Sequence, residues 1–456
     1  MSTLAQQIIY GTKDHVAQAL HRISDVNIID EYGFTPLIET AIVNDIEKAK
    51  LILEHNADPN FKDLTGGTAL HWAVENSHLE LCRLLLKRGA NPNAYTHASE
   101  APMVKALLRN NGALKDLLVE HGGNVTFAQD FIFTKLLGHR YSLKGYVDIV
   151  NPDNEFTEVN FEGFFLEFSV NLILNSLQEF EYNYAAKDIK PFFEKLEIII
   201  QALWTASELV KYQQYQIKLE KFQSRINQLL DFPLLILPIA FEGHAITLIR
   251  FKNYFIKCDR RKEELSINGI TIDEMKKPSQ FTKELMKFLL YEKKPAQFIE
   301  KDLPKLLELK HVARLMIEPQ SAGNCSWTNV EACLPACLLL LSHSKIPEGI
   351  IDYGSEEINI FRQWREWDRN RAMHFFKQEF SRATPARKAC IAAVLAAIFF
   401  QRLNAKKESD QKIAQEILPM LKTPGYEYIL ENYIELYCRK KPTRAGENLK
   451  QLLEEE

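Results

Sequence analysis

A sequence repeat with a period of 33 residues constrains the fold of this chain more than any other feature. At this offset "GFTPL" (33–37) lies over "GGTAL" (66–70), and "EAPMV" (100–104) follows about one unit later. The ends of the units also agree, because "LILEHNADPN" (51–60) aligns with "LLLKRGANPN" (84–93). A period of this length indicates small helical units that cannot bury an apolar face alone and therefore stack on one another.

The period and the recurring residue types resemble ankyrin repeats. The resemblance covers residues 1–129 and implies four units, of which the first and last are degenerate, as capping repeats are. It also implies that the Thr and His of "TALH" (68–71) are structural residues that tie the hairpin to the first helix. We therefore expect an all-α solenoid in this part of the chain, with the function of binding another protein.

Within the repeats, Trp72 directly follows the structural His71. The resemblance to ankyrins places its side chain on the concave face, where an exposed Trp is a candidate anchor for a partner. An aromatic ring at this position can equally pack on the neighbouring repeat, so both interpretations stay open. The hairpin tips supply the other candidate partner contacts, namely Phe61, Lys62, Tyr95, Thr96 and His97.

The segment "ANPN" (90–93) resembles the sites in ankyrin repeats that asparaginyl hydroxylases of animal cells modify. Asn93 stands eight residues after Leu85 and fits that pattern best, although Pro92 occupies a position where an aliphatic residue is usual. The resemblance implies that Asn93 is a modification site and that a host asparaginyl hydroxylase is a partner.

The composition is that of a folded soluble protein. The chain has 456 residues, enough for about two or three domains that each bury a core. Hydrophobic residues make up 46%, charged residues 25% and the net charge is −4, so nucleic acid is not the expected partner. The segment "RQWREWDRNRAMHFF" (362–376) mixes Arg and Trp but also contains Glu366 and Asp368. We interpret it as an ion-paired helix face.

Cysteine usage and hydropathy indicate where such a chain resides. The seven cysteines are odd in number and lack a framework spacing, which favours a reducing compartment with free thiols. Cys333 and Cys337 lie one helical turn apart without a histidine pair, so we expect neither a metal nor another cofactor. The first residues lack the features of a Sec signal. The longest apolar run, 389–400, is shorter than the roughly 20 residues of a membrane span, so none is expected.

Beyond the repeats, residues 130–345 mix helical and strand patterns and residues 346–456 are helical in pattern. Helical spacing of apolar residues covers 189–230. Strands are predicted from β-branched and aromatic runs at 141–150, 234–241, 244–251, 254–260, 265–272 and 313–319. The fold expected is therefore multidomain, with the ankyrin solenoid followed by an α+β domain and a helical C-terminal region.

Cys325 stands at a position that favours a reactive thiol. The predicted strand ends at Pro319, the loop "QSAGN" follows, and "CSWTNVEACL" (325–334) then begins a helix. The unpaired N–H groups of a helix N-terminus stabilise a thiolate, which is the nucleophilic form. Gln320 could present its side-chain amide to a developing oxyanion. The competing interpretation is a buried, unreactive cysteine, because Cys often only fills space in a core.

His244 has the best context for the base, since it opens a strand directly after Gly243. If residues 252–253 form a two-residue turn, Ile246 lies opposite Asp259, which makes Asp259 a diagonal neighbour of His244 on the same face. The Asp259 carboxylate could then orient the imidazole ring and stabilise its charged form. A loop of odd length would move Asp259 to the opposite face.

The chain order His244, Asp259, Gln320, Cys325 resembles the clan CE cysteine proteases, the Ulp, YopJ and adenovirus-protease group. The resemblance covers about residues 140–345 and implies a catalytic set acting on a host protein or a ubiquitin-like conjugate, as a protease, a deubiquitinase-like hydrolase or an acyltransferase. Three features depart from the pattern. "NCSW" is more papain-like, Gln320 is one residue closer than usual, and Pro335 would kink the helix after about three turns.

The acidic end "ENLKQLLEEE" (447–456) resembles recruitment signals on substrates of the Dot/Icm type IV secretion system. The architecture as a whole resembles Legionella ankyrin-repeat effectors. This resemblance implies delivery into a host cell, into the cytoplasm or nucleus, and binding of a host protein through the repeats. The alternative is a non-enzymatic scaffold in which the repeats and the protease-like fold redirect a host complex.

Overall fold

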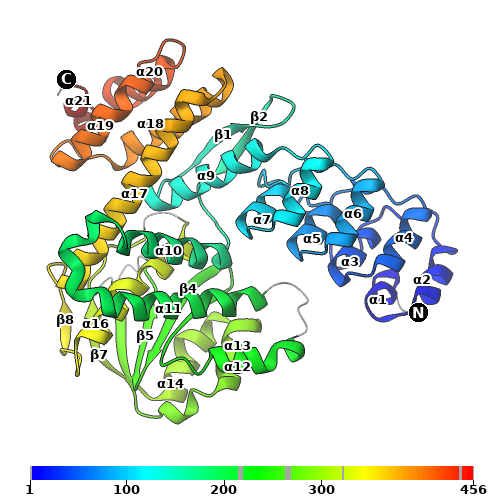
Figure 1. Ribbon diagram of the computed structural model, residues 1–456, viewed down its shortest axis with the longest axis horizontal. Coiled ribbons are helices and arrows are strands. Elements are labelled where there is room, and N and C mark those ends of the chain that lie inside the picture. Colours follow the sequence, from blue (N-terminus) through cyan, green and yellow to red (C-terminus); the bar gives the residue numbers. More distant parts are fainter. Residues whose placement is uncertain (1–2, 214–218, 262–268, 321–322, 441–443, 455–456) are drawn as a thin grey trace. The chain divides into compact units, whose positions relative to one another are not determined.

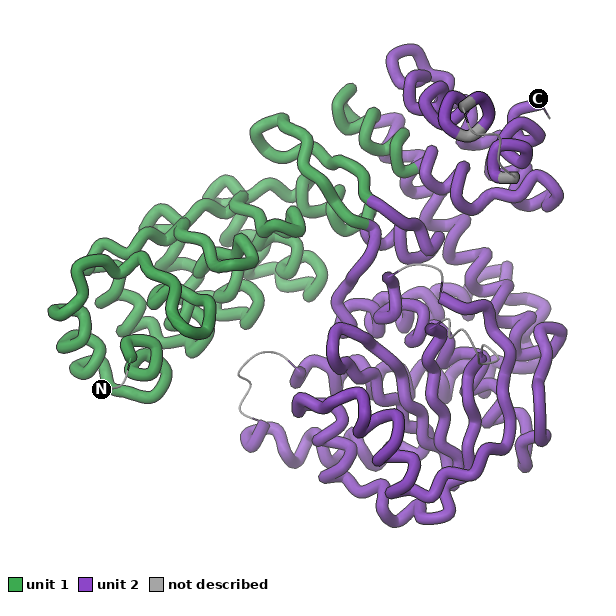
Figure 2. The backbone as a smooth tube through the Cα atoms, turned by 180° about the vertical axis from the view of Figure 1, so that it is seen from behind, with its two compact units in different colours: residues 1–134, 146–160, 383–394 green, residues 135–145, 161–382, 395–456 purple. Residues whose placement is uncertain are grey.

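The computed structural model describes residues 3–213, 219–261, 269–320, 323–440 and 444–454. The chain divides into two compact units, drawn in different colours in Figure 2. The first unit consists of Met1–Thr134, Tyr146–Asn160 and Ala383–Val394. The second unit consists of Lys135–Gly145, Phe161–Arg382 and Leu395–Glu456. The candidate partner contacts all lie in the first unit, and the residues proposed to act with Cys325 all lie in the second.

The ankyrin repeats expected from the sequence are present as stacked helix pairs (Figure 1). In order along the chain the helices are α1 (Leu4–Tyr10), α2 (Lys13–Leu20), α3 (Pro36–Val43), α4 (Ile46–Glu54), α5 (Ala69–Glu75), α6 (Leu79–Lys87), α7 (Pro102–Leu108) and α8 (Gly112–Glu120). The Thr and His of "TALH" have the structural role expected of them, because the N–H of Thr68 donates to Nδ1 of His71 at 3.1 Å and Nε2 of His71 lies 3.1 Å from the carbonyl oxygen of Glu100 in the next hairpin. In the preceding repeat the Oγ1 atom of Thr35 accepts the N–H of Ile38 at 3.2 Å and caps α3. The first helices of successive repeats pack on one another, which joins the units into one core.

A ladder of asparagine side chains links successive repeats. Asn93 donates from Nδ2 to the carbonyl of Gly122 at 2.8 Å, and its Oδ1 accepts the N–H of Asn124 at 2.8 Å. Asn60 makes the equivalent pair of hydrogen bonds one repeat earlier. Both ends of the Asn93 carboxamide are therefore engaged, so a hydroxylase acting on Asn93 would have to release this segment from the ladder first. Hydroxylation of Asn93 stays a prediction.

We expect Asn93→Ala to lower the free energy of unfolding of the repeats by about 1–2 kcal/mol, because two exposed hydrogen bonds are each worth about 0.5–1.5 kcal/mol net. Asn93→Asp keeps the acceptor for Asn124 and loses only the donor to Gly122, so its effect should lie between the wild type and Asn93→Ala. Urea unfolding followed by circular dichroism measures both. An unchanged midpoint in Asn93→Ala would mean that water replaces the ladder without cost.

After the repeats the chain forms α9 (Val125–Tyr141) and a hairpin of β1 (Tyr146–Val150) and β2 (Phe156–Asn160). The strand predicted at 141–150 therefore starts later than expected, and β2 was not predicted. The reason is local: Ser142 has a φ of 52°, and the N–H of Leu143 bonds the carbonyl of Gly138 at 2.8 Å, which closes the helix end before the strand begins.

The second unit is built on a six-stranded sheet with the order β3-β4-β5-β6-β7-β8. Its strands are β3 (Leu234–Phe241), β4 (His244–Phe251), β5 (Tyr254–Cys258), β6 (Ile270–Met275), β7 (Leu309–Leu315) and β8 (Gly349–Ile351). Neighbouring strands are antiparallel except β7 and β8, which are parallel. The structure confirms the predicted bounds of β3 and β4.

Strands β7 and β6 differ from their predicted bounds. The strand predicted at 313–319 lies instead at Leu309–Leu315, because β7 pairs along the whole length of β6, from Met275 opposite Leu309 to Ile270 opposite Leu315. The following residues leave the sheet and form the loop before Cys325. Of the strand predicted at 265–272, residues 262–268 lie outside the described residues, and β6 begins at Ile270.

Helices surround this sheet (Figure 1). They are α10 (Leu166–Glu181), α11 (Phe193–Val210), α12 (Gln223–Leu229), α13 (Lys283–Tyr291), α14 (Leu303–Leu307), α15 (Cys325–Glu331) and α16 (Cys333–Ser342). Apolar side chains of α11 to α14 share a core with Leu237 and Leu248 of the sheet, while α15 packs on β4. Every residue of β3 except Ala240 is buried, as expected for a strand covered on both faces.

The remaining elements are helical, as the sequence predicted. They are α17 (Glu356–Arg382), α18 (Pro385–Arg402), α19 (Glu408–Leu421), α20 (Glu427–Ile434) and α21 (Arg444–Glu454). Among the described residues, one stretch, Cys325–Ser342, is long and apolar enough to cross a membrane, but 83% of it is buried in the protein. It is the pair α15 and α16, which is interrupted at Ala332. The interruption fits Pro335, whose ring would clash with the carbonyl of Glu331 in a continuous helix.

Candidate cysteine-centred site

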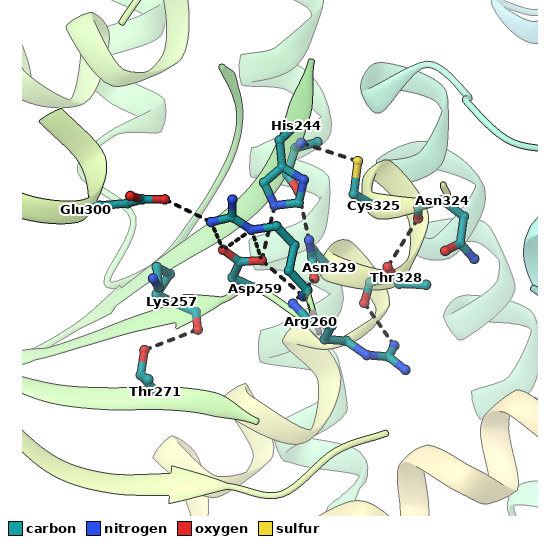
Figure 3. Close-up of polar contacts among 12 residues, drawn as sticks. His244, Lys257, Asp259, Arg260, Thr271, Glu300, Asn324, Cys325, Thr328 and Asn329 are labelled. Atoms are coloured by element: carbon teal, nitrogen blue, oxygen red, sulfur yellow. Dashed lines mark hydrogen bonds and ion pairs between the residues drawn. The ribbon is translucent and has the colours of Figure 1, made fainter. Parts of the chain in front are cut away.

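Three of the sequence-predicted residues come together at one end of the sheet (Figure 3). His244 opens β4 directly after the two-residue turn of Glu242 and Gly243, which have φ values of 46° and 75°. Asp259 follows the end of β5, and Cys325 is the first residue of α15. The Nε2 atom of His244 lies 3.1 Å from Oδ1 of Asp259. This contact leaves Nδ1 as the ring nitrogen for the thiol of Cys325, with which His244 also interacts.

The position of Asp259 follows from the register of the hairpin formed by β4 and β5. Phe251 lies opposite Tyr254, as expected from the sequence, and the pairing continues to Thr247 opposite Cys258. The ladder stops there, one pair before Ile246 would meet Asp259. Beyond that point the strands separate, so the backbone groups of Ala245 and Arg260 that would have paired bond to other partners.

Asn329 fills the gap where the two strands separate. Its Nδ2 donates to the carbonyl of Ala245 at 2.8 Å, and its Oδ1 accepts the N–H of Arg260 at 2.9 Å. One carboxamide thus takes the place of the missing ladder bond between these two residues. Asn329 stands one helical turn after Cys325, and the N–H of Ala245 donates to the Sγ atom of Cys325 at 3.4 Å. The helix that carries the thiol is therefore fixed to both strands of the hairpin.

The loop before Cys325 is fixed to the same point of the hairpin. The backbone N–H of Gln320 donates to the carbonyl of Arg260 at 2.7 Å, and the Nε atom of Arg260 donates to the carbonyl of Glu318 at 2.8 Å. Gln320 is thus held next in space to the segment that carries Asp259. Its role as an oxyanion donor stays a prediction.

Four polar residues that build this site were not predicted from the sequence. Asn329 could have been found as an amide one helical turn after Cys325, on the same face of the helix. Arg260 and Glu331 form a buried ion pair at 2.8 Å, with side chains only 3% and 4% exposed, and no local signal relates these positions. Arg261 lies across Asp259: its Nε donates to Oδ1 at 3.2 Å and its Nη2 donates to Oδ2 at 2.8 Å.

The electrostatics of the site favour a charged cysteine–histidine pair. Burial lowers the pKa of His244, but the hydrogen bonds and charges of Asp259 and Cys325 outweigh it and raise this pKa to about 9. Burial raises the pKa of the Cys325 thiol, but the bonds from His244 and from the N–H of Ala245, with the charge of His244, lower it overall. Burial also raises the pKa of Asp259, yet His244 and Arg261 hold it well below its usual range. The thiolate and the imidazolium therefore stabilise each other.

Unlike Cys325, the other six cysteines are buried. All seven are free thiols, and Cys325 alone is only partly buried. Burial raises the pKa of Cys82 and of Cys390 to about 12. The described part of the chain contains no group of three or more His, Cys, Asp or Glu side chains placed to hold a metal ion.

The predicted partner contacts lie in the repeats and not at this site. Trp72 is partly buried: its Nε1 donates to Oδ2 of Asp63 at 2.8 Å, and its ring meets Phe34 edge-on at 5.0 Å. Of the two readings left open by the sequence, packing on a neighbouring repeat is present, and a role in binding stays a prediction. Lys62 reaches the tip of the next repeat, donating to the carbonyl of Tyr95 at 3.2 Å. Phe61 and Thr96 are partly buried and His97 is exposed.

Comparison with known proteins identifies the repeats. A family model of ankyrin repeats matches residues 4–96 as three copies. An ankyrin repeat protein of Acanthamoeba polyphaga mimivirus is 41% identical over 56 residues, which is 12% of this chain. The chain spans only 7% of the length of that viral protein, so this likeness concerns the repeats alone.

Fold and site together define an ankyrin-repeat protein with an attached mixed helix and sheet region that carries a cysteine–histidine–aspartate cluster. The solved structure of the Legionella effector AnkH matches 100% of this chain and 97% of its own, with 37% sequence identity and a TM-score of 0.87. The chain belongs to the same family as AnkH.

Proposed function

We propose that this protein is a bacterial effector that enters a host cell by type IV secretion, binds a host protein through its ankyrin repeats and uses Cys325 to cleave an acyl bond. The similarity to the Legionella effector AnkH over the whole chain supports the effector role. The repeats support the protein-binding role, because stacked ankyrin units present an extended concave surface. Its place of action would be the host cytoplasm or nucleus.

One observation carries the enzymatic part of the proposal. The Nε2 atom of His244 is 3.1 Å from Oδ1 of Asp259, and the same side chain interacts with Cys325, the one cysteine that is not fully buried. This is the arrangement that nucleophilic catalysis by a thiol needs, with a nucleophile, a base in reach and a third group that orients the base.

In the reaction we propose, the thiolate of Cys325 attacks the carbonyl carbon of a peptide or isopeptide bond. A C–S bond forms, and the backbone N–H at the start of α15 together with Gln320 stabilises the oxyanion. The imidazolium of His244 then donates its proton to the leaving amine as the C–N bond breaks. Water, deprotonated by His244, hydrolyses the thioester and restores the thiol. An amine or hydroxyl in place of that water would make the same site an acyltransferase. Asp259 holds the ring in position throughout.

The alternative function is a non-enzymatic scaffold, and one contact favours it. Arg261 approaches Asp259 with an Nη2–Oδ2 distance of 2.8 Å, and that guanidinium also pairs with Glu300. A guanidinium already compensates the charge of Asp259, so less of this charge is available to stabilise the imidazolium. In this case the site would be a structural part of an interaction platform.

Complementation separates these two functions. A strain of the source bacterium that lacks the gene would be supplied with wild type, Cys325→Ala or Trp72→Ala, and its growth in host cells would be counted. We expect Cys325→Ala to fail as completely as an empty vector, with Cys438→Ala, a buried thiol elsewhere, as the matched control. Full growth with Cys325→Ala, combined with failure of Trp72→Ala or Tyr95→Ala, would establish the scaffold and refute catalysis.

A further inference from the structure

A cavity of about 260 Å³ lies in the second unit, and none of His244, Asp259 and Cys325 lines it. Side chains of α17, the end of α18, the start of α19 and the loop after β7 line it. The wall is partly apolar, with the aromatic rings of Tyr141, Tyr353 and Phe361 among its members. The segment 362–376, which the sequence analysis interpreted as an ion-paired helix face, forms one side of this cavity.

Three arginines of α17 line the cavity, and the guanidinium of each lies over one of the three aromatic rings. The guanidinium carbon of Arg365 is 5.2 Å from the centre of the Phe361 ring, and that of Arg369 is 5.5 Å from the centre of Tyr141. Arg362 lies over Tyr353 at 6.0 Å in the same way. Stacking occupies the flat face of a guanidinium and leaves its N–H edge directed sideways. These edges can donate to a ligand without giving up the stacking.

The cavity holds more positive than negative charge. Its cationic residues are Arg362, Arg365, Arg369, Arg402 and Lys407, and its carboxylates are Glu318, Glu366 and Asp410. Arg365 is compensated, since it approaches Glu331 at 3.4 Å and Glu318 at 3.9 Å. Within the described ranges, Arg362, Arg369 and Lys407 form no ion pair with a carboxylate.

Arg369 is one of the three cations without an ion pair in the described ranges. Its Nε donates to the carbonyl of Arg140 at 2.7 Å, which satisfies one donor but not the charge. Burial and the neighbouring Arg365 lower the pKa of Arg369 to about 10. A positive charge that is partly desolvated and lies beside another cation is stabilised by an incoming anion.

We propose that this cavity binds a small organic phosphate. The phosphate group would lie against the N–H edges of Arg362 and Arg369, because planar guanidinium groups match phosphate oxygens in pairs. The ring or sugar part would pack on the aromatic and aliphatic wall. The volume is close to the lower end of about 300–1,000 Å³ that is typical of ligand pockets, which fits a mononucleotide or a sugar phosphate.

Isothermal titration of the full-length protein tests this assignment. The probes are AMP and glucose 6-phosphate, each compared with its unphosphorylated counterpart, adenosine or glucose, and with inorganic phosphate. We expect saturable binding of at least one ester, about tenfold tighter than its unphosphorylated counterpart and tighter than inorganic phosphate. No saturable binding of either ester at millimolar concentration would overturn the proposal, as would equal binding of inorganic phosphate.

Variants locate the binding. Arg369→Gln and the exposed Arg362→Gln should each weaken the ester by about tenfold, because each removes a charged donor to the phosphate. Arg382→Gln changes an exposed arginine at the far end of the same helix and should leave binding unchanged. Since Arg362 is exposed, Arg362→Gln keeps the test valid even where Arg369→Gln does not fold. Undiminished affinity in Arg362→Gln, or an equal loss in Arg382→Gln, would place the ligand elsewhere.

Discussion

Cys325 should react with iodoacetamide much faster than the other six cysteines, and it should keep this reactivity to a lower pH than an ordinary thiol. The reason is the ion pair with His244, whose pKa of about 9 keeps the ring charged below that pH and lowers the pKa of the thiol. The ionised fraction of the thiol is therefore retained as pH falls from 9 and is lost only below the lowered pKa of Cys325. In His244→Ala the thiol should return to an ordinary pKa near 8.5, so its rate at pH 6 should fall by roughly tenfold to a hundredfold.

Mass spectrometry of peptides provides the rate for every cysteine in one experiment. The other six cysteines act as internal controls, because all are buried and should react slowly at every pH. Asp259→Asn should give an intermediate rate at pH 6, since it removes the charge that stabilises the imidazolium and leaves the ring in place. If Cys325 reacts slowly, and if its alkylation rate is the same in His244→Ala, the thiol is a packing residue.

The largest loss of stability should follow from breaking the ion pair of Arg260 and Glu331. Both side chains are almost completely buried, so Glu331→Ala leaves a guanidinium in the core without its nearest carboxylate. Removing one partner of a buried pair costs about 3–5 kcal/mol, and we expect a loss of this size in the free energy of unfolding. The midpoint of urea unfolding, followed by tryptophan fluorescence, measures it.

Two further variants decide whether the unpaired charge is the cause. Replacing both partners, as Arg260→Met with Glu331→Leu, should recover much of the loss, because the guanidinium of Arg260 is removed together with its carboxylate. Recovery should be incomplete, since Arg365 also loses its contact with Glu331 and keeps only the one with Glu318. Glu348→Ala breaks an exposed pair with Lys345 and should change stability by less than about 1 kcal/mol. A double variant as unstable as Glu331→Ala would mean that lost packing, and not the buried charge, accounts for the effect.

The sequence predicts those parts of the molecule that depend on short-range rules. The repeats are visible because each unit repeats the same helix caps and turns at a fixed spacing. The hairpin of β4 and β5 is visible because a two-residue turn at Lys252 and Asn253 leaves only one register, which brings Asp259 to the side of His244. The position of Cys325 at a helix start follows from the loop composition before it.

The features that the sequence did not predict depend on pairs of residues far apart in the chain. Nothing near Glu331 indicates that Arg260 will meet it in the core, and nothing near Asn329 indicates that it will replace a ladder bond of β4. The bounds of β7 were wrong for the same reason, because they are set by pairing with β6 and not by the apolar run around it. The arginine–aromatic stacks of α17 likewise require the fold that surrounds them.

The inserted carboxamide of Asn329 also has a consequence for the order in which the protein folds. His244 and Asp259 belong to one local hairpin, which can close early, whereas Asn329 and Cys325 arrive from a helix about 80 residues further along the chain. Until α15 docks, nothing separates the strands beyond Thr247, and the thiol has no imidazolium beside it. Activation of the thiol is therefore a late event of folding, and a chain that is still unfolded carries Cys325 as an ordinary cysteine.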